Sequence, residues 1–501
     1  MGADIQHFIA GESFAGGSGR LGDVFNPATG EVRAQCAYAA AEDVDEAVRA
    51  ATLASKKWAR TSIARRLEIL FAFRNEFIAA RDELARLIGL EHGKTLSDGQ
   101  GELQRALEAI EFACSMPHLI KGEYSLNIGG DIDNFSVSQP LGVVGCISPF
   151  NFPAMVPLMM ATMAVAVGNA VLLKPSERVP SAAVELARIW QRAGLPDGVW
   201  NVVHGAKEAV DAILTHPGIA AVSFVGSTRV AEYVYEEGSR NGKRVMAFGG
   251  GKNHMLVLPD ADLNLVADHF VGAGYGSAAQ RCMAISVAVP VGEATADALV
   301  ERLVPRIEEL KVGAYDDTEA DFGPLITRQS KDTVERFIGE SLADGAELCV
   351  DGREIEVAGY ENGFFLGGTL VDHVRPGMSF YREEVFGPAR GIVRATDVDE
   401  AIELVNDHEF GNGAAIFTRD GHAARRFFDE IDVGMIGVNV PVPVPAGYHN
   451  FGGLKRSKFG EGHLYGPDAA RFYTKIKTIS ARWPAPSSGS AGADLTMPTN
   501  E

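Results

Sequence analysis

A cysteine with a cation beside it is the strongest candidate nucleophile in this sequence. Of the five cysteines, only Cys282 is flanked by a charged residue, Arg281, and by a break in the chain pattern after a predicted helix. A neighbouring cation favours the thiolate, which is the reactive form of the side chain. Most unpaired cysteines are simply small buried residues, so Cys282 is the one for which we expect covalent chemistry.

Two further motifs place polar side chains beside aromatic ones. In Pro149-Phe150-Asn151-Phe152-Pro153, the Asn151 amide can donate to an oxyanion that develops in a dry site, although asparagine is more often a turn former. In Glu383-Glu384-Val385-Phe386, a carboxylate precedes an aromatic ring by two residues, a pair suited to a ribose and a flat ring. A solvated acidic loop explains the second motif as well, so neither motif decides a function by itself.

Two strand ends in the first half of the chain have the chemistry of a nucleotide site. Lys174 and Glu177 follow a hydrophobic strand, where open α/β sheets receive ligands, and can hydrogen-bond ribose hydroxyls or remain solvated. Ser227 lies where a strand gives way to a helix, which suits an anion and an ordinary N-cap equally. The Gly17–Gly22 GxGxxG string lacks the strand and helix that such a fingerprint needs, so we expect a flexible loop.

The elements that must position these residues have the pattern of an α/β protein. From about Val143 onward, continuously hydrophobic runs alternate with helical segments, which predicts parallel strands covered on both faces. The predicted strands are Val143–Ile147, Ala170–Leu173, Val199–Val203, Ala221–Val225 and Arg244–Phe248, with helices at Ala154–Val167, Ser181–Ala193, Lys207–Thr215 and Arg229–Ser239. A second α/β region begins near Gly249, with strands at Met255–Leu258, Ile285–Val291, Gly413–Phe417 and Met435–Asn439 and helices at Leu263–Ser277, Thr295–Leu310, Lys331–Leu342 and Asp399–Asn406.

Three segments lie outside this pattern. Residues 43–115 look helical, Glu123–Ile128 and Asn134–Gln139 flank a Gly-Gly-Asp turn like a hairpin, and Arg471–Ile479 has the composition of a strand. Since the hairpin and the late strand cannot easily bury themselves within either α/β region, we expect them to pair with another subunit.

Composition restricts the classes of partner. The 501 residues contain 46 Lys and Arg against 66 Asp and Glu, a net charge of −20, which disfavours nucleic acid and anionic membranes. The uncharged run Phe152–Leu173 is long enough for a bilayer, but Pro153, Pro157 and Gly168-Asn169 divide it into a buried helix and strand. Cysteines without metal spacing and an N-terminus without a targeting pattern predict a reduced, cytoplasmic protein with no metal site.

The ordered set PFNFP, KPSE, FVGST, a Cys after a helix and EEVFGP resembles the aldehyde dehydrogenase superfamily from about Ile5 to Trp483. The resemblance implies an aldehyde-dehydrogenase-like α/β fold with a Rossmann-type cofactor domain, a second α/β catalytic domain and a small β oligomerisation arm, assembled as a homo-oligomer with a tetramer favoured. The implied divisions are residues 1–121 and 142–248 for the NAD-binding domain, 249–450 for the catalytic domain, 122–141 and 451–483 for the arm and C-terminal strand, and 484–501 for a disordered tail.

The same resemblance implies a role for each motif. Cys282 matches the nucleophile and Asn151 the oxyanion-binding amide. The implied NAD contacts are Lys174 and Glu177 for the adenosine ribose, Ser227 for the pyrophosphate, Glu384 for the nicotinamide ribose, its hydrophobic neighbour Phe386, and Phe150.

Departures from the general family pattern indicate the acyl acceptor. Hydrolytic members carry Glu-Leu-Gly-Gly-Lys, whose Glu activates water, and we interpret Ala247 as its replacement in Ala247-Phe-Gly-Gly-Gly-Lys252. A thiol acceptor depends less on a general base than water does, because a few per cent of the thiol is ionised near neutrality. The chain thus resembles the CoA-acylating methylmalonate-semialdehyde dehydrogenases, although Gln280 and Gly251 stand where an acidic residue and Ala are usual.

The resemblance to this branch implies oxidation of methylmalonate or malonate semialdehyde, with Arg105 and Arg281 holding the substrate carboxylate. Decarboxylation and transfer to CoA would give propionyl-CoA or acetyl-CoA. Two alternatives stay open: a hydrolytic NAD-dependent enzyme that releases a free acid, and a non-catalytic structural or binding relative.

Overall fold

The computed structural model describes residues 4–484 and 495–497, and an eight-stranded sheet forms the centre of the first half of the chain. The strand order is β2-β1-β9-β8-β7-β10-β11-β21, and the strands from β9 to β11 run parallel. The bounds are β1 His7–Ile9, β2 Glu12–Phe14, β7 Val143–Ile147, β8 Ala170–Lys174, β9 Trp200–Val202, β10 Ile219–Val225, β11 Arg244–Phe248 and β21 Lys458–Gly460. All five strands predicted here are confirmed, and the N-terminal strands β1 and β2 extend the sheet beyond the prediction.

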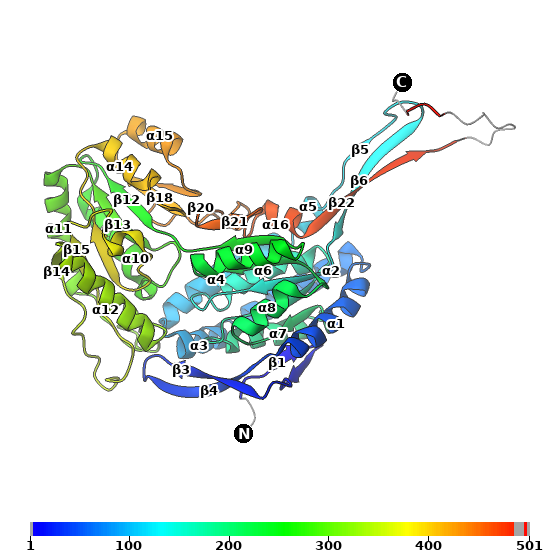
Figure 1. Ribbon diagram of the computed structural model, residues 1–501, viewed down its shortest axis with the longest axis horizontal. Coiled ribbons are helices and arrows are strands. Elements are labelled where there is room, and N and C mark those ends of the chain that lie inside the picture. Colours follow the sequence, from blue (N-terminus) through cyan, green and yellow to red (C-terminus); the bar gives the residue numbers. More distant parts are fainter. Residues whose placement is uncertain (1–3, 485–494, 498–501) are drawn as a thin grey trace.

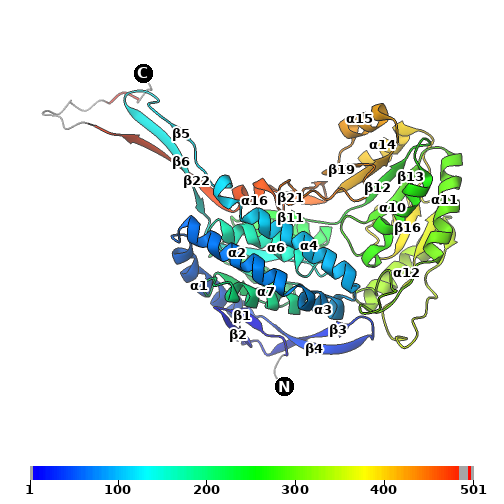
Figure 2. The ribbon, with the colours of Figure 1, turned by 180° about the vertical axis from the view of Figure 1, so that it is seen from behind.

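Helices cover both faces of this sheet, as opposite views show in Figure 1 and Figure 2. Cys146 and Leu173 belong to the core that includes α2, α4, α6 and α7, whereas Ile147 and Leu172 belong to the core that includes α1, α8 and α9. Because successive strand residues face two different cores, these strands read as unbroken hydrophobic runs. The helices are α1 Ala41–Trp58, α2 Ile63–Ala79, α3 Arg81–His92, α4 Leu96–Ala113, α5 Met116–Leu119, α6 Met155–Ala166, α7 Ser181–Arg192, α8 Lys207–Thr215 and α9 Thr228–Arg240.

A seven-stranded sheet forms the second α/β region, in the order β14-β15-β16-β13-β12-β18-β19, with only β14 antiparallel to its neighbour. Its strands are β12 Asn253–Val257, β13 Ile285–Pro290, β14 Glu347–Val350, β15 Thr369–Asp372, β16 Ala389–Ile392, β18 Gly413–Phe417 and β19 Met435–Val438. Its helices are α10 Leu263–Tyr275, the 3₁₀ turn η1 Gly276–Ala279, α11 Glu293–Glu308, α12 Arg328–Ala343, α13 Ser379–Arg382, α14 Val398–Asn406 and α15 Gly421–Glu430. The four strands predicted in this region are confirmed.

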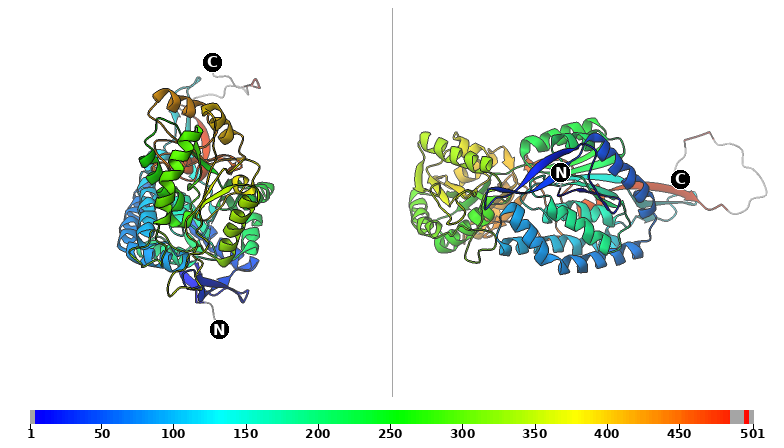
Figure 3. Two further views of the ribbon diagram at one scale, coloured as in Figure 1. Left: turned by 90° about the vertical axis from the view of Figure 1, so that its left-hand side faces the viewer. Right: turned by 90° about the horizontal axis from the view of Figure 1, so that it is seen from below.

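A three-stranded arm extends away from the rest of the molecule, as Figure 1, Figure 2 and the right-hand view of Figure 3 show. It consists of β5 Tyr124–Ser125, β6 Ile132–Pro140 and β22 Thr474–Arg482, with β6 between the other two. The expected division differs at residues 451–473, because β20 Leu454–Lys455 pairs with β17 Phe410–Gly411, β21 joins the first sheet, and α16 Pro467–Phe472 contacts α6. Most of the predicted 484–501 tail lies outside the described residues, and the Gly17–Gly22 string runs into β3 Arg20–Asn26, which pairs with β4 Glu31–Tyr38.

The link between the two large sheets decides which edges meet. β11 ends at Phe248 and β12 begins at Asn253, so only residues 249–252 separate the carboxyl end of one strand from the amino end of the next. In both sheets the neighbouring strands are parallel. The carboxyl edge of the first sheet therefore approaches the amino edge of the second, and loops from both edges carry the predicted site residues.

Candidate active site

Cys282 lies in a short loop between η1 and β13 that two asparagines hold in place. The side-chain amides of Asn253 and Asn412 each donate to the Cys282 carbonyl oxygen at 2.9 Å. Immediately before the loop, residues 277–279 have φ angles of 59°, 49° and 57°, although none of them is glycine. Left-handed backbone is costly for such residues, so the surrounding contacts must hold this segment in place.

The electrostatic surroundings of Cys282 differ from the sequence expectation. Burial, followed by the Glu384 carboxylate, raises the pKa of the Cys282 thiol to about 12. Arg281 does not counter this effect, because its guanidinium forms an ion pair with Asp98. The expectation that Arg281 favours the thiolate is therefore wrong in this structure, and the thiol needs a proton acceptor before it can attack.

Asn151 follows β7 at the carboxyl edge of the first sheet, in a segment that we call the Asn151 turn (residues 151–155). Its side chain is buried, and its amide makes no hydrogen bond to another described residue. Its backbone carbonyl, in contrast, accepts a hydrogen bond from Lys94 Nζ at 2.9 Å. The backbone is thus held while the side-chain amide remains free to donate to a ligand.

Glu384 lies before β16, in what we call the Glu384 loop (residues 383–387), and its carboxylate accepts from the Gly251 N–H at 3.2 Å. A Cβ atom at Gly250 would lie 2.3 Å from the Glu384 carboxylate, so a larger residue there would displace that carboxylate. Burial raises the pKa of the Glu384 carboxyl to about 7. In the same loop, the Phe386 ring meets Phe150 edge-on, with centroids 5.8 Å apart at 84°, so this loop contacts the residue directly before the Asn151 turn.

Two buried cations hold the Glu384 loop through backbone carbonyls. Lys252 Nζ donates to the carbonyl oxygens of Phe380 at 2.5 Å and Glu383 at 2.9 Å. Arg390 donates to the carbonyls of Val385 and Gly387, and also to Ile285 at 3.0 Å. Burial lowers the pKa of Lys252 to about 7 and that of Arg390 to about 10, since no carboxylate in the described structure forms a salt bridge with either cation.

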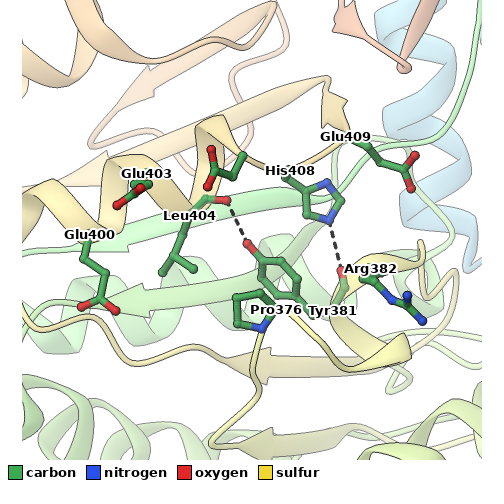
Figure 4. Close-up of a pocket in the computed structure, with 9 residues that line it drawn as sticks. Pro376, Tyr381, Arg382, Glu400, Glu403, Leu404, His408 and Glu409 are labelled. Carbon is green, nitrogen blue, oxygen red and sulfur yellow. Dashed lines mark hydrogen bonds between the residues drawn. The ribbon is translucent and has the colours of Figure 1, made fainter.

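A cavity of about 450 Å³ lies beside this loop, and none of the predicted site residues lines it (Figure 4). Inside it, the Tyr381 hydroxyl donates to the Leu404 carbonyl at 2.9 Å, and His408 Nε2 lies 3.2 Å from the Tyr381 carbonyl. His254 Nε2 lies 2.9 Å from the same Tyr381 hydroxyl. These contacts tie α13 to α14 directly ahead of residue 383, so the lining residues support the Glu384 loop.

The residues expected to bind the adenosine end lie along the carboxyl edge of the first sheet. Lys174 Nζ lies 3.2 Å from the Glu177 carboxylate at the end of β8. Burial alone would raise the pKa of Glu177, but the charge and hydrogen bond of Lys174, a backbone hydrogen bond and the Arg178 charge together lower it. Ser227 occupies the N-cap of α9 without a side-chain capping bond, which leaves its hydroxyl and the helix N-terminus available to an anion.

The two arginines expected to hold a substrate carboxylate reach the site from different elements. Arg281 lies beside Cys282 in the chain and is paired with Asp98 of α4. Arg105, about two helical turns further along α4, forms an ion pair with Glu108 at 2.6 Å and donates to the Pro445 carbonyl. The Tyr465 hydroxyl donates to that same carbonyl at 2.7 Å. Arg105 and the Cys282 thiol both act on the pKa of Tyr465, so Arg105 lies near the nucleophile.

The family model described as aldehyde dehydrogenase family matches residues 14–479 of this sequence. The chain belongs to the aldehyde dehydrogenase family. The resemblance deduced from the motifs is thereby confirmed, and with it the α/β fold class.

Similar proteins narrow the comparison within the aldehyde dehydrogenases. The chain is 53% identical to a malonate-semialdehyde dehydrogenase of Pseudomonas aeruginosa, covering 96% of both chains, and 45% identical to the acylating, mitochondrial methylmalonate-semialdehyde/malonate-semialdehyde dehydrogenase of Rattus norvegicus, covering 99% and 92%. The crystal structure of a methylmalonate-semialdehyde dehydrogenase from Oceanimonas doudoroffii aligns with a TM-score of 0.95 at 52% identity, covering 96% and 99%. A structure from Sinorhizobium meliloti 1021 complexed with NAD aligns with a TM-score of 0.95 at 51% identity, covering 96% and 98%.

The position of the family's water-activating glutamate is corrected by the structure. Counted back from Lys252 without a gap, Glu-Leu-Gly-Gly-Lys places the glutamate at Phe248 rather than Ala247. The Ala247 side chain packs in the core of α8 and α9, whereas Phe248 packs in the core on the opposite face, against which Cys282 also packs. Adjacent strand residues face opposite sides of the sheet. Phe248, and not Ala247, therefore stands on the side of the Cys282 thiol.

Several groups that hold the site gave no signal in the sequence, among them Lys94, Glu102, Asn253, Lys252, Asn412 and Arg390. The two noted departures also have structural roles. The Gln280 side chain accepts from the Ile326 N–H at 3.0 Å and donates to the Pro324 carbonyl at 3.3 Å, which a carboxylate could not do. At Gly251, a Cβ atom would lie 2.9 Å from Asn412 Cβ.

Among the described residues, none of the helices has both the length and the apolar character needed to cross a bilayer. The same part of the chain contains no group of three or more His, Cys, Asp or Glu side chains arranged for a metal ion.

Proposed function

We propose that this chain is an NAD-dependent, CoA-acylating dehydrogenase of methylmalonate semialdehyde and malonate semialdehyde. The observation that carries the proposal is the surroundings of Cys282, where Phe248 occupies the position of the water-activating glutamate. Glu384 is the only carboxylate that acts on the thiol in the described structure. Relatives of those two names, including one named as acylating, support the substrate and the acceptor.

The carboxyl edge of the first sheet fits NAD. The Ser227 hydroxyl and the N-terminus of α9 are available to the pyrophosphate, and Lys174 with Glu177 to the adenosine ribose. At the other end, the Glu384 carboxylate suits the second ribose, and Phe150 and Phe386 supply an apolar wall for the nicotinamide. When bound, NAD accepts the hydride that the substrate loses.

The chain's own residues account for the remaining steps of oxidation. Cys282, once deprotonated, adds to the aldehyde carbon, and the Asn151 amide with the Cys282 backbone N–H stabilises the oxyanion. Each such donor typically contributes about 3 kcal/mol to the transition state. Loss of hydride leaves a thioester on Cys282. Because one product leaves before the acyl acceptor reacts and the other leaves afterwards, this covalent intermediate predicts ping-pong kinetics.

Transfer of the acyl group to CoA is supported by Phe248, which places no carboxylate at the position of the water-activating glutamate. Glu384, the carboxylate that does act on the thiol, is assigned above to a ribose of NAD. Water reacts slowly without a general base, whereas a thiol is already partly ionised near neutrality. Loss of the substrate carboxylate as CO₂ then gives propionyl-CoA from methylmalonate semialdehyde or acetyl-CoA from malonate semialdehyde.

Product analysis by mass spectrometry, with both semialdehydes and with and without CoA, tests the proposal. Sustained NADH formation with a free acid and no CoA would instead support the hydrolytic alternative. Phe248→Glu should raise CoA-independent hydrolysis by about 10²-fold, since a positioned general base contributes that much. The matched variant Ala247→Glu, on the opposite face, should not raise it.

We propose that Arg105 and Arg281 bind the substrate carboxylate, because a guanidinium grips a carboxylate through two parallel hydrogen bonds. Replacing either arginine with Leu should lower kcat/KM for methylmalonate semialdehyde far more than for propanal. Equal losses on the two aldehydes would assign both arginines to support of the fold.

We further propose a homo-oligomer, with a tetramer favoured, that assembles through the arm. Tyr124, Leu126, Ile476 and Trp483 are 60%, 76%, 72% and 71% exposed there, which is unusual for apolar side chains on one small sheet. A cytoplasmic location is supported by the five cysteines, all unpaired in the structure. Sedimentation of the whole chain, with and without Ile476→Glu, tests the assembly.

A further inference from the structure

Two charged side chains without a role in the proposed reaction lie against the Asn151 turn. Lys94 and Glu102 are only 1% and 4% exposed, and Lys94 Nζ lies 2.8 Å from the Glu102 carboxylate. Removing two charges from water is costly unless their remaining hydrogen-bonding capacity is also satisfied. The partners that satisfy them therefore reveal what this ion pair holds.

Every further partner belongs to the Asn151 turn. Lys94 Nζ donates to the carbonyl oxygen of Asn151 at 2.9 Å and lies 4.4 Å from the centroid of the Phe152 ring. The second oxygen of Glu102 accepts the N–H groups of Ala154 at 2.9 Å and Met155 at 3.0 Å. The ion pair thus binds the beginning and the end of one five-residue segment.

The ion pair is itself fixed by the helices that carry it. Lys94 lies between Gly93, which ends α3 with a φ of 90°, and Thr95, whose side chain caps the start of α4. Glu102 lies on the buried face of α4, which packs against α6. The backbone that carries each charge is therefore set by the packing of these helices.

We propose that Lys94 and Glu102 are positioning residues for the oxyanion-binding amide of Asn151. The ammonium fixes the Asn151 carbonyl and the carboxylate fixes the end of the turn, so the free side-chain amide projects from a backbone held on both sides. Misplacement of a reacting group by about 1 Å can cost about 10²-fold in rate. The inference rests on the oxidation step of the proposed function and is independent of the acyl acceptor.

Single-turnover NADH formation by the full chain tests this role in Lys94→Met, Asn151→Ala and the double variant. Lys94→Met should lose about 10-fold to 10²-fold in that rate, in keeping with the cost of misplacement. The double variant should be no slower than Asn151→Ala, because the amide that Lys94 positions is already absent. Alkylation of Cys282 by iodoacetamide and the Kd of NAD should stay unchanged, since neither needs the oxyanion amide.

Arg66→Met is the matched control. Arg66 is another buried cation that holds the opposite end of α6, donating to the Ala166 carbonyl at 2.6 Å. The Arg66→Met variant should have a lower Tm than the unmodified chain but the same rate of single-turnover NADH formation. Equal slowing by Arg66→Met, or a multiplicative loss in the double variant, would overturn the proposal and leave Lys94 a merely structural residue.

Glu102→Gln keeps the shape of the site and serves if Lys94→Met does not fold. It should slow single turnover while sparing alkylation, and an unchanged single-turnover rate would also overturn the proposal. Absence of NADH formation by the unmodified chain with every aldehyde would instead contradict the proposed function.

Discussion

The Asn151 turn and the Glu384 loop are held by buried cations in opposite electrical settings. At the Asn151 turn, Lys94 is paired with Glu102, and the two together bind backbone groups of one turn. At the Glu384 loop, Lys252 and Arg390 donate hydrogen bonds only to carbonyl oxygens. Against the lowering by burial, the Glu384 carboxylate raises the pKa of both cations, and Glu383 raises that of Lys252 as well, without forming a salt bridge with either. The Lys94–Glu102 ion pair fixes the geometry of the Asn151 turn. At the Glu384 loop, where Lys252 has no salt-bridge partner, Lys252 and Glu384 both have a pKa of about 7 and so gain or lose protons near neutrality.

The largest expected effect is on stability. Lys94→Met should cost about 3–5 kcal/mol, because it leaves the Glu102 carboxylate buried without its partner. Lys252→Met should cost less, about 1–3 kcal/mol, since it removes a costly buried charge and leaves only backbone carbonyls unpaired. Thermal unfolding of both variants measures the difference in the free energy of unfolding. Equal losses would contradict the distinction between a paired cation at Lys94 and an unpaired one at Lys252.

The next effect is on catalysis. Asn151→Ala should lower the rate of single-turnover NADH formation by about 10²-fold to 10³-fold, the usual loss of one oxyanion donor. The Kd of NAD should remain the same because the amide does not bind the cofactor. A large loss of NAD affinity would show that the Asn151 turn and the Glu384 loop do not have separate roles.

A smaller effect is expected at the cofactor. Glu384→Gln should weaken NAD binding by about tenfold, the equivalent of one charge-assisted hydrogen bond to a ribose hydroxyl. Fluorescence titration with NAD measures this change. Since Glu384 also contributes to the raised pKa of Cys282, alkylation of the thiol should become faster in the variant.

The smallest expected effect is on pH dependence. The pKa of Glu384 is raised from 4.5 to about 7, so the carboxyl is mostly neutral below pH 7, and its contribution to folding stability is lost as pH rises from about 4.5 to about 7. NAD needs the carboxylate, so its affinity should fall by up to about tenfold between pH 8 and pH 6.

Two variants assign that pH dependence. Glu384→Gln should flatten the profile, whereas Lys252→Met should keep it while raising the midpoint, because the Lys252 charge lowers the pKa of Glu384. A profile that is unchanged in Glu384→Gln would assign the titration to another group.

Much of the fold was predictable because its strands are simple. Val143–Ile147, Arg244–Phe248 and Gly413–Phe417 have the bounds that the hydrophobic pattern predicts, since a strand between two helical layers must be apolar on both sides. The strands β1, β2 and β21 escaped prediction because each is only three residues long, and β2 and β21 also lie at the edges of the sheet, where they are not fully buried. The assignment of the water-activating position to Ala247 failed because neighbouring residues of a strand face opposite sides of the sheet. An alignment error of one residue therefore moved the position from one core to the other.

The sequence by itself determined the chemistry: a thiol, a free amide and a carboxylate in motifs that each occupy a few consecutive residues, and the alternating strands and helices that place those motifs at strand ends. The tertiary structure alone decided what holds them. Lys94 and the Asn151 carbonyl are 57 residues apart, and Arg281 is neutralised by Asp98 at a separation of 183 residues. A buried charge must find a partner wherever the fold brings one, and no local pattern records which partner that will be.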